Sequence, residues 1–358
     1  MLLPLAAQAD TWEDYANARF RTRYVVGGAV IIAKDGEILH SLSYGFRNVR
    51  KTEPATLDTC FRIASATKLI SAIGLLQLME EKGLGLDTPA KDILGIHIGN
   101  PNFPDQPVTV RQILSHTSGL EQTQYYFPNW EKMPPGTKYF SKKYAPGTKY
   151  TYSNLNGGLI GAMIEALSGQ SVNSYMQQHV FDPLGINAAY HPALLHDITD
   201  IADQLRNDGS LIQRASKTLE KFDEYEDTCD PRNHTHLTSG KLYISANGLF
   251  RIITMLQRGG ELDGVRILQP ETVKAMMQPQ HLIPGSSVTG ESPYGLCMHR
   301  VNDLPGGTWY GHQGRYEGLS SDLYFQPDTG LSIVVIGNGY QEPVYQLCGD
   351  AGSFLHGK

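Results

Sequence analysis

Ser65 and Lys68 form the one S-x-x-K motif of the chain. Apolar residues flank the motif and a helical pattern follows it, so the two side chains would share one helix face. A lysine buried at the start of a helix has a lowered pKa and can accept a proton from serine, while the helix N-terminus stabilises a developing anion. The motif predicts a serine nucleophile with a lysine base. A serine helix cap followed by a surface lysine fits these residues when they are taken alone.

Tyr152 and Asn154 form a second candidate piece, directly after a Pro-Gly-Thr-Lys-Tyr run at 146–150. A tyrosine close to a buried lysine can carry the serine proton to the leaving group. The asparagine amide can donate to a substrate carbonyl and accept from the lysine. Tyr150 is a competing candidate, but only Tyr152 has an asparagine two residues later. The same five-residue run at 135–139 lacks that asparagine and predicts a rim loop.

His312, Gln313 and Gly314 lie on a predicted strand near the end of the chain. A glycine there would let a substrate backbone approach the strand edge. The N–H of Arg315 would then join that of Ser65 in holding an oxyanion. The guanidinium of Arg315 either binds a free carboxylate or points to solvent. Taken alone, the same residues also fit a strand with a satisfied histidine and a bulge glycine.

Hydrophobic periodicity predicts the elements that must hold these side chains together. A helix that runs from Leu69 to Lys82 and stops at Gly83 is apolar nearly all round, so it should be buried at the centre of a domain. The turn at Asp35 and Gly36, between two apolar runs, predicts a hairpin over 25–46. Further helices are predicted at 110–114, 157–167, 172–180, 247–258 and 344–355, a tight hairpin at 261–265, and strands at 308–312, 320–325 and 331–337.

Strands near both ends of the chain, with helices between them, predict one α/β domain made from residues 10–84 and 240–358. Residues 85–239 are predicted to form a mainly helical inserted domain. A long loop at 121–150 is rich in aromatic residues, which either line an apolar acyl pocket or pack under the helical domain. Its candidate aromatic residues are Tyr125, Tyr126, Phe127, Trp130, Tyr139, Phe140 and Tyr144.

The order of the three pieces, on a helix start, a loop and a strand, resembles the serine β-lactamase-like superfamily. Within it, the chain looks like the branch of class C β-lactamases, serine D,D-carboxypeptidases, D-aminopeptidases and related esterases. The resemblance implies an α+β, β-lactamase/transpeptidase-like fold, with an antiparallel sheet flanked by helices plus a mainly helical inserted domain. It implies Ser65 as the acylated nucleophile, Lys68 as its base partner, Tyr152 as the proton shuttle and Asn154 as the substrate-amide contact. The segments that carry it are 61–68, 113–120, 146–154, 311–314 and 324–330.

The third motif departs from the class C pattern. Class C β-lactamases carry Lys-Thr-Gly where this chain has His312, Gln313 and Gly314, closer to the His-x-Gly of peptidase and esterase members. This departure argues against efficient β-lactam turnover, although Arg315 could supply the missing positive charge. The segment from His116 to Gly119 is also typical of the family, and we interpret it as structural, a helix end closed by Gly119.

We therefore expect a serine hydrolase that forms an acyl-enzyme at Ser65, acting on a small-molecule or peptide substrate. A D-alanyl-D-alanine carboxypeptidase-like or β-lactamase-related amide hydrolase is the first hypothesis, and a carboxylesterase of the same fold is the alternative. A penicillin-binding sensor without turnover is a third hypothesis. No cofactor or metal is expected, and the H-x-H pair at His234 and His236 is interpreted as a solvated loop.

The composition and charge of the chain argue against several other classes of protein. The 358 residues are 41% hydrophobic and 18% charged, which argues against disorder. A net charge of −6 gives no basic surface for a nucleic-acid partner, and no apolar run is long enough for a membrane span.

The cysteines and the N-terminus bear on the cellular compartment. The four widely spaced cysteines are expected to be free core thiols, although two disulfides remain possible: Cys60, Cys229, Cys297 and Cys348. Residues 1–9 resemble the remnant of a signal peptide, so a periplasmic or secreted location is expected and a cytoplasmic one stays open.

Overall fold

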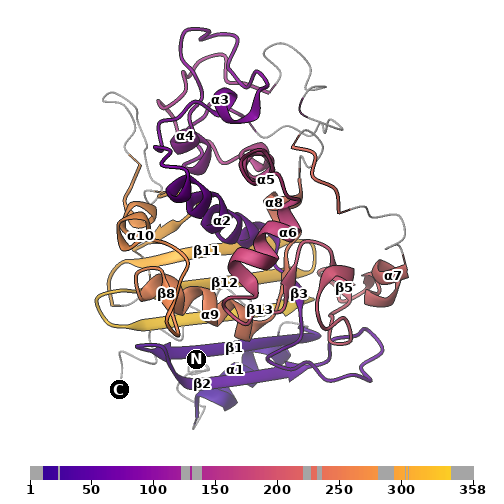
Figure 1. Ribbon diagram of the computed structural model, residues 1–358. Helices are drawn as coiled ribbons and strands as arrows, with labels where there is room; N and C mark the ends of the chain where they lie inside the picture. The colour runs from indigo at the N-terminus through magenta and orange to yellow at the C-terminus, as the bar shows by residue number, and fades with distance from the viewer. Residues whose placement is uncertain are drawn as a thin grey trace.

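The computed structural model describes residues 11–22, 25–121, 130, 139–220, 227–231, 236–280, 294–302, 304 and 306–339. Its central feature is a six-stranded antiparallel sheet in the order β10-β11-β12-β13-β1-β2 (Figure 1). The strands span Gly27–Lys34 (β1), Glu37–Gly45 (β2), His299–Val301 (β10), Trp309–Tyr316 (β11), Leu319–Gln326 (β12) and Leu331–Asn338 (β13).

The two ends of the described chain meet in this sheet. β1 pairs with β13 along its whole length, from Gly27 opposite Asn338 to Lys34 opposite Leu331. The predicted hairpin is confirmed, because β1 and β2 are joined by a turn in which Asp35 and Gly36 both have positive φ angles. One antiparallel sheet is therefore built from both ends of the described chain, as the fold implied by the motifs requires.

Helices cover both faces of the sheet. Because successive residues of a strand point to opposite faces, Val30 packs toward α1 (Trp12–Thr22) and Ile31 packs toward the opposite layer. That opposite layer contains α9 (Ala246–Gln257), which lies against β12 and β13, and α2 (Thr67–Glu81). The sheet is thus buried on both sides.

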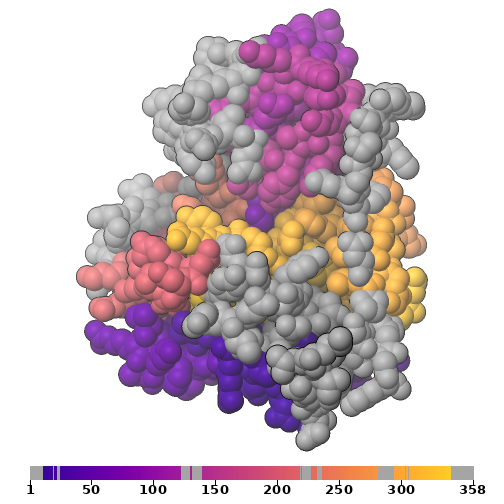
Figure 2. Space-filling model, turned by 180° about the vertical axis from the view of Figure 1, so that it is seen from behind, coloured from indigo at the N-terminus to yellow at the C-terminus, as the bar shows by residue number. Residues whose placement is uncertain are grey.

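The predicted central helix is present as α2, and its residues from Thr67 to Leu76 are all buried. It packs against α5 (Asn154–Ser168) and α8 (Leu237–Gly240). Figure 2, seen from behind, shows the magenta part of the chain that holds α5 standing above the yellow strands of the sheet. The start of α2 therefore lies where the helical part of the chain meets the sheet.

The region between α2 and α9 is rich in helices but not purely helical. Helices occur at the predicted places as α4 (Val110–Leu114), α5 and α6 (Val172–Met176), with a π turn at Gln177–Phe181. Short strands also occur: β4 (Ala188–Ala189) pairs with β7 (Tyr243–Ile244), which pairs with β3 (Phe61–Arg62). Residues 188–189 therefore join a small sheet with residues outside 85–239, and the domain boundaries at 84 and 239 stay a prediction. Other elements here are α3 (Ala90–Leu94), η5 (Pro192–Leu194), β5 (Gln204–Leu205), β6 (Leu211–Gln213) and α7 (Ala215–Glu220).

The remaining elements test the other expectations. The hairpin at 261–265 is confirmed as β8 (Glu261–Leu262) and β9 (Val265–Arg266), whereas α1, α10 (Pro270–Met277) and β10 were not predicted. The predicted helix at 344–355, the signal remnant at 1–9 and His234 lie outside the described residues. In the part of the chain that the structure describes, no helix is long and apolar enough to cross a membrane.

The predictions for the aromatic loop and for the cysteines are confirmed only in part. Trp130, Tyr139 and Phe140 are buried in the main core, as loop packing requires, whereas 125–127 lie outside the described residues. Cys60 and Cys297 are free and buried, as expected. Cys229 is free but exposed, and Cys348 is not among the described residues.

Candidate active site

Ser65 lies in a 3₁₀ turn, η2 (Ala64–Ala66), directly before α2. Ala64 has a φ of 47°, a left-handed conformation that is strained for a residue with a side chain. Neighbouring chain holds this turn in place: the Ile63 N–H donates to Leu242 O at 3.0 Å, and Ser321 Oγ donates to Ile63 O at 2.8 Å. The Ser65 hydroxyl is therefore presented by a fixed backbone.

Lys68 connects Ser65 to two other segments. Its Nζ donates to Ser65 Oγ at 3.2 Å, to Asn154 Oδ1 at 2.8 Å and to Ser239 O at 2.6 Å. The side chain is completely buried, and this burial lowers the pKa of Lys68 to about 7, with a smaller opposing influence from Cys297. Near neutral pH the amine can therefore exist without its proton, beside the hydroxyl that it would deprotonate.

Gly157 is a residue that the sequence reasoning missed. A Cβ atom at this position would lie 2.8 Å from Lys68 Cε and 2.9 Å from Ser239 Cα. Only glycine allows α5 to approach Lys68 this closely. The available signal was two consecutive glycines, Gly157 and Gly158, inside a predicted helix, where glycine is unfavourable unless a close approach requires it.

Tyr152 packs beside this pair. Lys68 Nζ lies 5.0 Å from the centroid of the Tyr152 ring. Burial raises the pKa of Tyr152 well above its ordinary value, and the nearby Ser65 partly offsets this. Within the described structure the buried Tyr152 hydroxyl makes no hydrogen bond. The competing candidate, Tyr150, places its ring 5.6 Å from that of Tyr294. Of the two tyrosines, Tyr152 is the one beside both Lys68 and Ser65.

His116 holds the segment that carries Tyr152. The His116 carbonyl accepts from Thr151 N at 2.8 Å, and its Nδ1 accepts from Ser153 N at 3.3 Å and from Asn156 Nδ2 at 3.1 Å. Its ring centroid lies 4.4 Å from that of Tyr152. His116 therefore grips the chain on both sides of Tyr152, a role that the sequence reasoning did not assign.

The predicted helix end at Gly119 is wrong in its detail. Helix α4 ends at Leu114, with Ser115 as its C-cap. Gly119 lies four residues later, with a φ of 79°, and its carbonyl accepts from Ser141 N at 2.8 Å. Because the turn after the helix places its carbonyls and side chains against 141–156, the segment supports that loop rather than closing the helix.

His312 is buried in β11 and both of its ring nitrogens are engaged. Nε2 accepts from the Tyr294 hydroxyl at 3.0 Å, and Nδ1 donates to Gln313 O at 2.6 Å. Burial lowers the pKa of His312 well below its ordinary value, and the neighbouring His299, with ring centroids 4.4 Å apart, lowers it further. His312 is therefore neutral and does not supply the positive charge that the lysine of Lys-Thr-Gly would.

Gly314 is required by the protein's own chain. A Cβ atom at this position would lie 1.9 Å from Ile63 O and 2.5 Å from Ser321 Oγ. The expected close approach at this glycine is thus made by the backbone that leads into Ser65, and no substrate is needed to explain it. Strand β10 pairs with β11 only over 309–311, so the described strands leave that side of β11 open from His312 onward. The oxyanion role of the Arg315 N–H stays a prediction.

The Arg315 side chain is already bonded to other groups of the protein. Its Nη2 donates to both carboxylate oxygens of Asp322 at 2.8 Å, and its Nη1 donates to Gly314 O and Ser321 O. Asp322 is fully buried, which raises its pKa, and the positive charge of Arg315 acts in the opposite direction. The predicted bidentate grip on a substrate carboxylate is not available, because Asp322 already occupies the guanidinium fork.

These residues together offer a nucleophilic hydroxyl, a buried amine that can be neutral, a phenol beside both, and an amide oxygen that fixes the amine. This is the chemistry of acyl transfer through serine. Across the described ranges, no group of three or more His, Cys, Asp or Glu side chains is arranged to hold a metal ion.

Comparisons with known proteins show which proteins this chain is similar to. The Beta-lactamase family model matches residues 12–350. Penicillin-binding protein 4* of Bacillus subtilis is 30% identical over 340 residues, which cover 90% of this chain and 70% of that protein. Monacolin J acid methylbutanoyltransferase of Aspergillus terreus is 26% identical over 379 residues, covering 89% and 87%. A solved class C beta-lactamase superposes with a TM-score of 0.75 at 16% identity, covering 98% of this chain and 99% of that one, and shows the shared fold.

Proposed function

Because this chain belongs to the Beta-lactamase family, we propose that it is a serine acyl hydrolase that works through an acyl-enzyme at Ser65. The observation that carries the proposal is the set of hydrogen bonds from the buried Lys68 amine to Ser65, Asn154 and Ser239. Burying an amine costs free energy, and buried groups with strongly shifted pKa values are concentrated at functional sites.

The proposed reaction has two stages. Neutral Lys68 accepts the Ser65 proton as Oγ attacks the carbonyl carbon of an ester or amide. The bond between that carbon and the leaving group then breaks as Lys68 returns the proton, through Tyr152, to the leaving alcohol or amine, which leaves Lys68 neutral again. The N–H groups of Ser65 and Arg315 hold the negative oxygen. In the second stage Lys68 takes a proton, through Tyr152, from a water molecule that attacks the acyl carbon. The bond between the acyl carbon and Ser65 Oγ then breaks and Lys68 returns the proton to Oγ, which releases the acid and restores the Ser65 hydroxyl.

The third motif bears on the substrate. With His312 neutral and Arg315 paired to Asp322, neither motif side chain offers a cation to a carboxylate beside the scissile bond. This favours a carboxylesterase over a D-alanyl-D-alanine carboxypeptidase or an efficient β-lactamase. The D,D-peptidase remains the second candidate, supported by the 30% identity to a penicillin-binding protein. Release of D-alanine from a D-alanyl dipeptide, measured beside hydrolysis of a short nitrophenyl ester, separates the two.

Replacing Ser65 tests the proposed function. We expect the parent protein to gain one adduct mass from a fluorophosphonate, with the label located on Ser65 after digestion, and we expect Ser65→Ala to gain none. Ser71→Ala is the matched control, because its hydroxyl lies on the same helix but bonds to Thr67 O and Tyr190 Oη. Labelling of Ser65→Ala at the parental rate would disprove the nucleophile. A long-lived penicillin adduct without turnover of any ester would favour the sensor instead.

A further inference from the structure

Two cationic side chains flank the turn that carries Ser65. Arg62 lies on β3, three residues before Ser65, and Lys241 follows directly after Gly240. Gly240 packs on Ala64, since a Cβ atom on it would lie 3.5 Å from the Ala64 carbonyl carbon. The Arg62 Nε donates to Gly240 O at 2.8 Å, which ties the two segments together. Both cations are therefore anchored within a few residues of the nucleophile.

Neither cation has an acidic partner among the described residues. The Arg62 guanidinium lies over the Tyr316 ring, 4.9 Å from its centroid, and Lys241 is partly exposed to solvent. Other arginines of the described chain pair with carboxylates: Arg47 with Glu53, Arg111 with Asp87, Arg251 with Asp263, Arg266 with Glu261, and Arg315 with Asp322.

The titratable side chains near Lys241 are also bases, namely Arg62, His191 and His236. Burial and then the positive charge of Arg62 lower the pKa of Lys241. Burial and then Lys241 lower the pKa of His191, and they lower the pKa of His236 to about 4. The Arg62 and Lys241 cations are therefore close enough to act on each other, and like charges held together raise the free energy of the empty site. An anion placed between Arg62 and Lys241 would offset this cost.

We propose that Arg62 and Lys241 bind a carboxylate at the far end of the substrate's acyl chain, so that the enzyme prefers acyl groups derived from dicarboxylic acids. The inference rests on the proposed acyl-enzyme at Ser65. Tyr152, which protonates the leaving group, belongs to the segment before α5, whereas the cations belong to β3 and to the chain after α8. Because the cations and the leaving-group acid come from different segments, the proposed anion is on the part of the substrate that stays on Ser65. The half-exposed ring of Tyr316 offers an apolar surface for the methylene chain between the two ends.

Two esters of equal acyl length test this inference: p-nitrophenyl hexanoate, which is neutral, and the p-nitrophenyl monoester of adipic acid, which carries one carboxylate. We expect kcat/KM for the adipate ester to fall about tenfold in Lys241→Gln and further in Lys241→Glu, through KM, while the hexanoate values stay within twofold. The adipate preference of the parent should also shrink at high salt, because exposed charges are screened. Lys274→Gln, an exposed lysine on α10, is the control.

The outcomes separate this inference from the proposed function. Equal loss for both esters in Lys241→Gln, or no loss for either, would overturn the carboxylate site while Ser65-dependent turnover of hexanoate still supports the hydrolase. If neither ester acylates Ser65, both proposals fail. A third substrate, the hexanoyl ester of 4-hydroxybenzoate, carries its carboxylate on the leaving group. If Lys241→Gln impairs this ester and not the adipate ester, the acyl-side assignment is wrong.

Discussion

At the scale of single residues, burial controls the charges in the candidate site. Among the described residues Lys68 has three hydrogen-bond acceptors but no carboxylate partner, so loss of water lowers its pKa to about 7. Asp322 is equally buried, but Arg315 donates two charged hydrogen bonds to its carboxylate, which offset part of the cost of burying that charge. Lys68, which has no opposite charge beside it within the described structure, is therefore suited to gain and lose a proton. The ion pair of Arg315 and Asp322 is structural.

The pKa of Lys68 predicts the pH dependence of acylation. Lys68 must be neutral to accept the Ser65 proton, so kcat/KM for a neutral ester should rise with pH and level off above about 7. The buried histidines do not explain such a limb, because burial lowers the pKa of His299 to about 4 and those of His116 and His312 well below the ordinary value. The measurement is kcat/KM from pH 5.5 to 9.5, corrected for buffer hydrolysis. A limb near pH 10 would contradict the proposed base.

At the scale of elements, the segment that follows α4 and contains His116 positions the segment that precedes α5 and contains Tyr152. Thr151 and Ser153, on either side of Tyr152, both donate backbone N–H groups to His116. Ser118 Oγ donates to Asn156 Oδ1 at 2.7 Å, which fixes the amide that donates to the His116 ring. The two segments therefore form one unit, and the direction of the Tyr152 phenol depends on the acceptor at His116.

Two substitutions distinguish the role of the hydrogen-bond acceptor on His116 from the role of its aromatic ring. His116→Phe keeps an aromatic ring at the same strained φ of 56° but leaves the Ser153 and Asn156 donors unpaired. We expect it to lower stability by about 1–3 kcal/mol and kcat by at least about tenfold. His116→Asn keeps an acceptor near the Nδ1 position and should retain more of both.

The readouts for this pair are the thermal unfolding midpoint and the split between kcat and KM. Because Tyr152 is proposed to move protons, the loss should fall mainly on kcat. His97→Asn is the control, an exposed histidine of the helical region. A His116→Phe protein with parental kcat would show that the acceptor does not position Tyr152.

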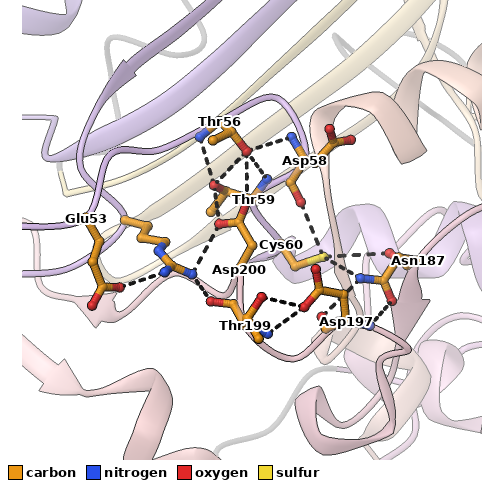
Figure 3. Close-up of polar contacts among 10 residues, drawn as sticks. Glu53, Thr56, Asp58, Thr59, Cys60, Asn187, Asp197, Thr199 and Asp200 are labelled. Atoms are coloured by element: carbon orange, nitrogen blue, oxygen red, sulfur yellow. Dashed lines mark hydrogen bonds and ion pairs between the residues drawn. The ribbon is translucent and has the colours of Figure 1, made fainter.

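At the scale of the whole molecule, polar contacts fasten the chain before β3 to a distant segment (Figure 3). The Asp200 carboxylate accepts from Thr56 Oγ1 at 2.8 Å and from Thr59 Oγ1 at 2.6 Å, and its carbonyl accepts from Cys60 N at 2.8 Å. Arg47 bridges Asp200 and Glu53. These contacts join residues 47–60 to residue 200, just upstream of the turn that carries Ser65.

Removing Asp200 tests this connection. Asp200→Ala leaves the two threonine hydroxyls and Arg47 without their shared acceptor, so we expect a loss of about 1–3 kcal/mol in the free energy of unfolding. At 25 °C the folded variant should keep kcat within about threefold, because no reacting group is touched. Denaturant unfolding beside the exposed control Asp105→Ala provides the measurement. An unchanged midpoint in Asp200→Ala would show that the network adds no net stability.

The sequence by itself predicted the local parts. The apolar pattern after Ser65 identified α2 and put Ser65 and Lys68 within reach of each other, and the Asp35-Gly36 turn identified the first hairpin. The order of the motifs along the chain identified the family. Burial, turn chemistry and i to i+3 spacing are properties of neighbouring residues, so a single sequence records them.

Only the tertiary structure decided which group each side chain meets. The sequence predicted a strand at 308–312. The structure extends β11 to Tyr316, and pairing with β12 brings the Arg315 guanidinium to Asp322. The ring acceptor of His116 and the need for glycine at Gly157 and Gly314 depend on contacts between segments far apart in the chain. A hydrophobic pattern specifies which face of an element is buried; the partner on the other side is set by how whole elements pack.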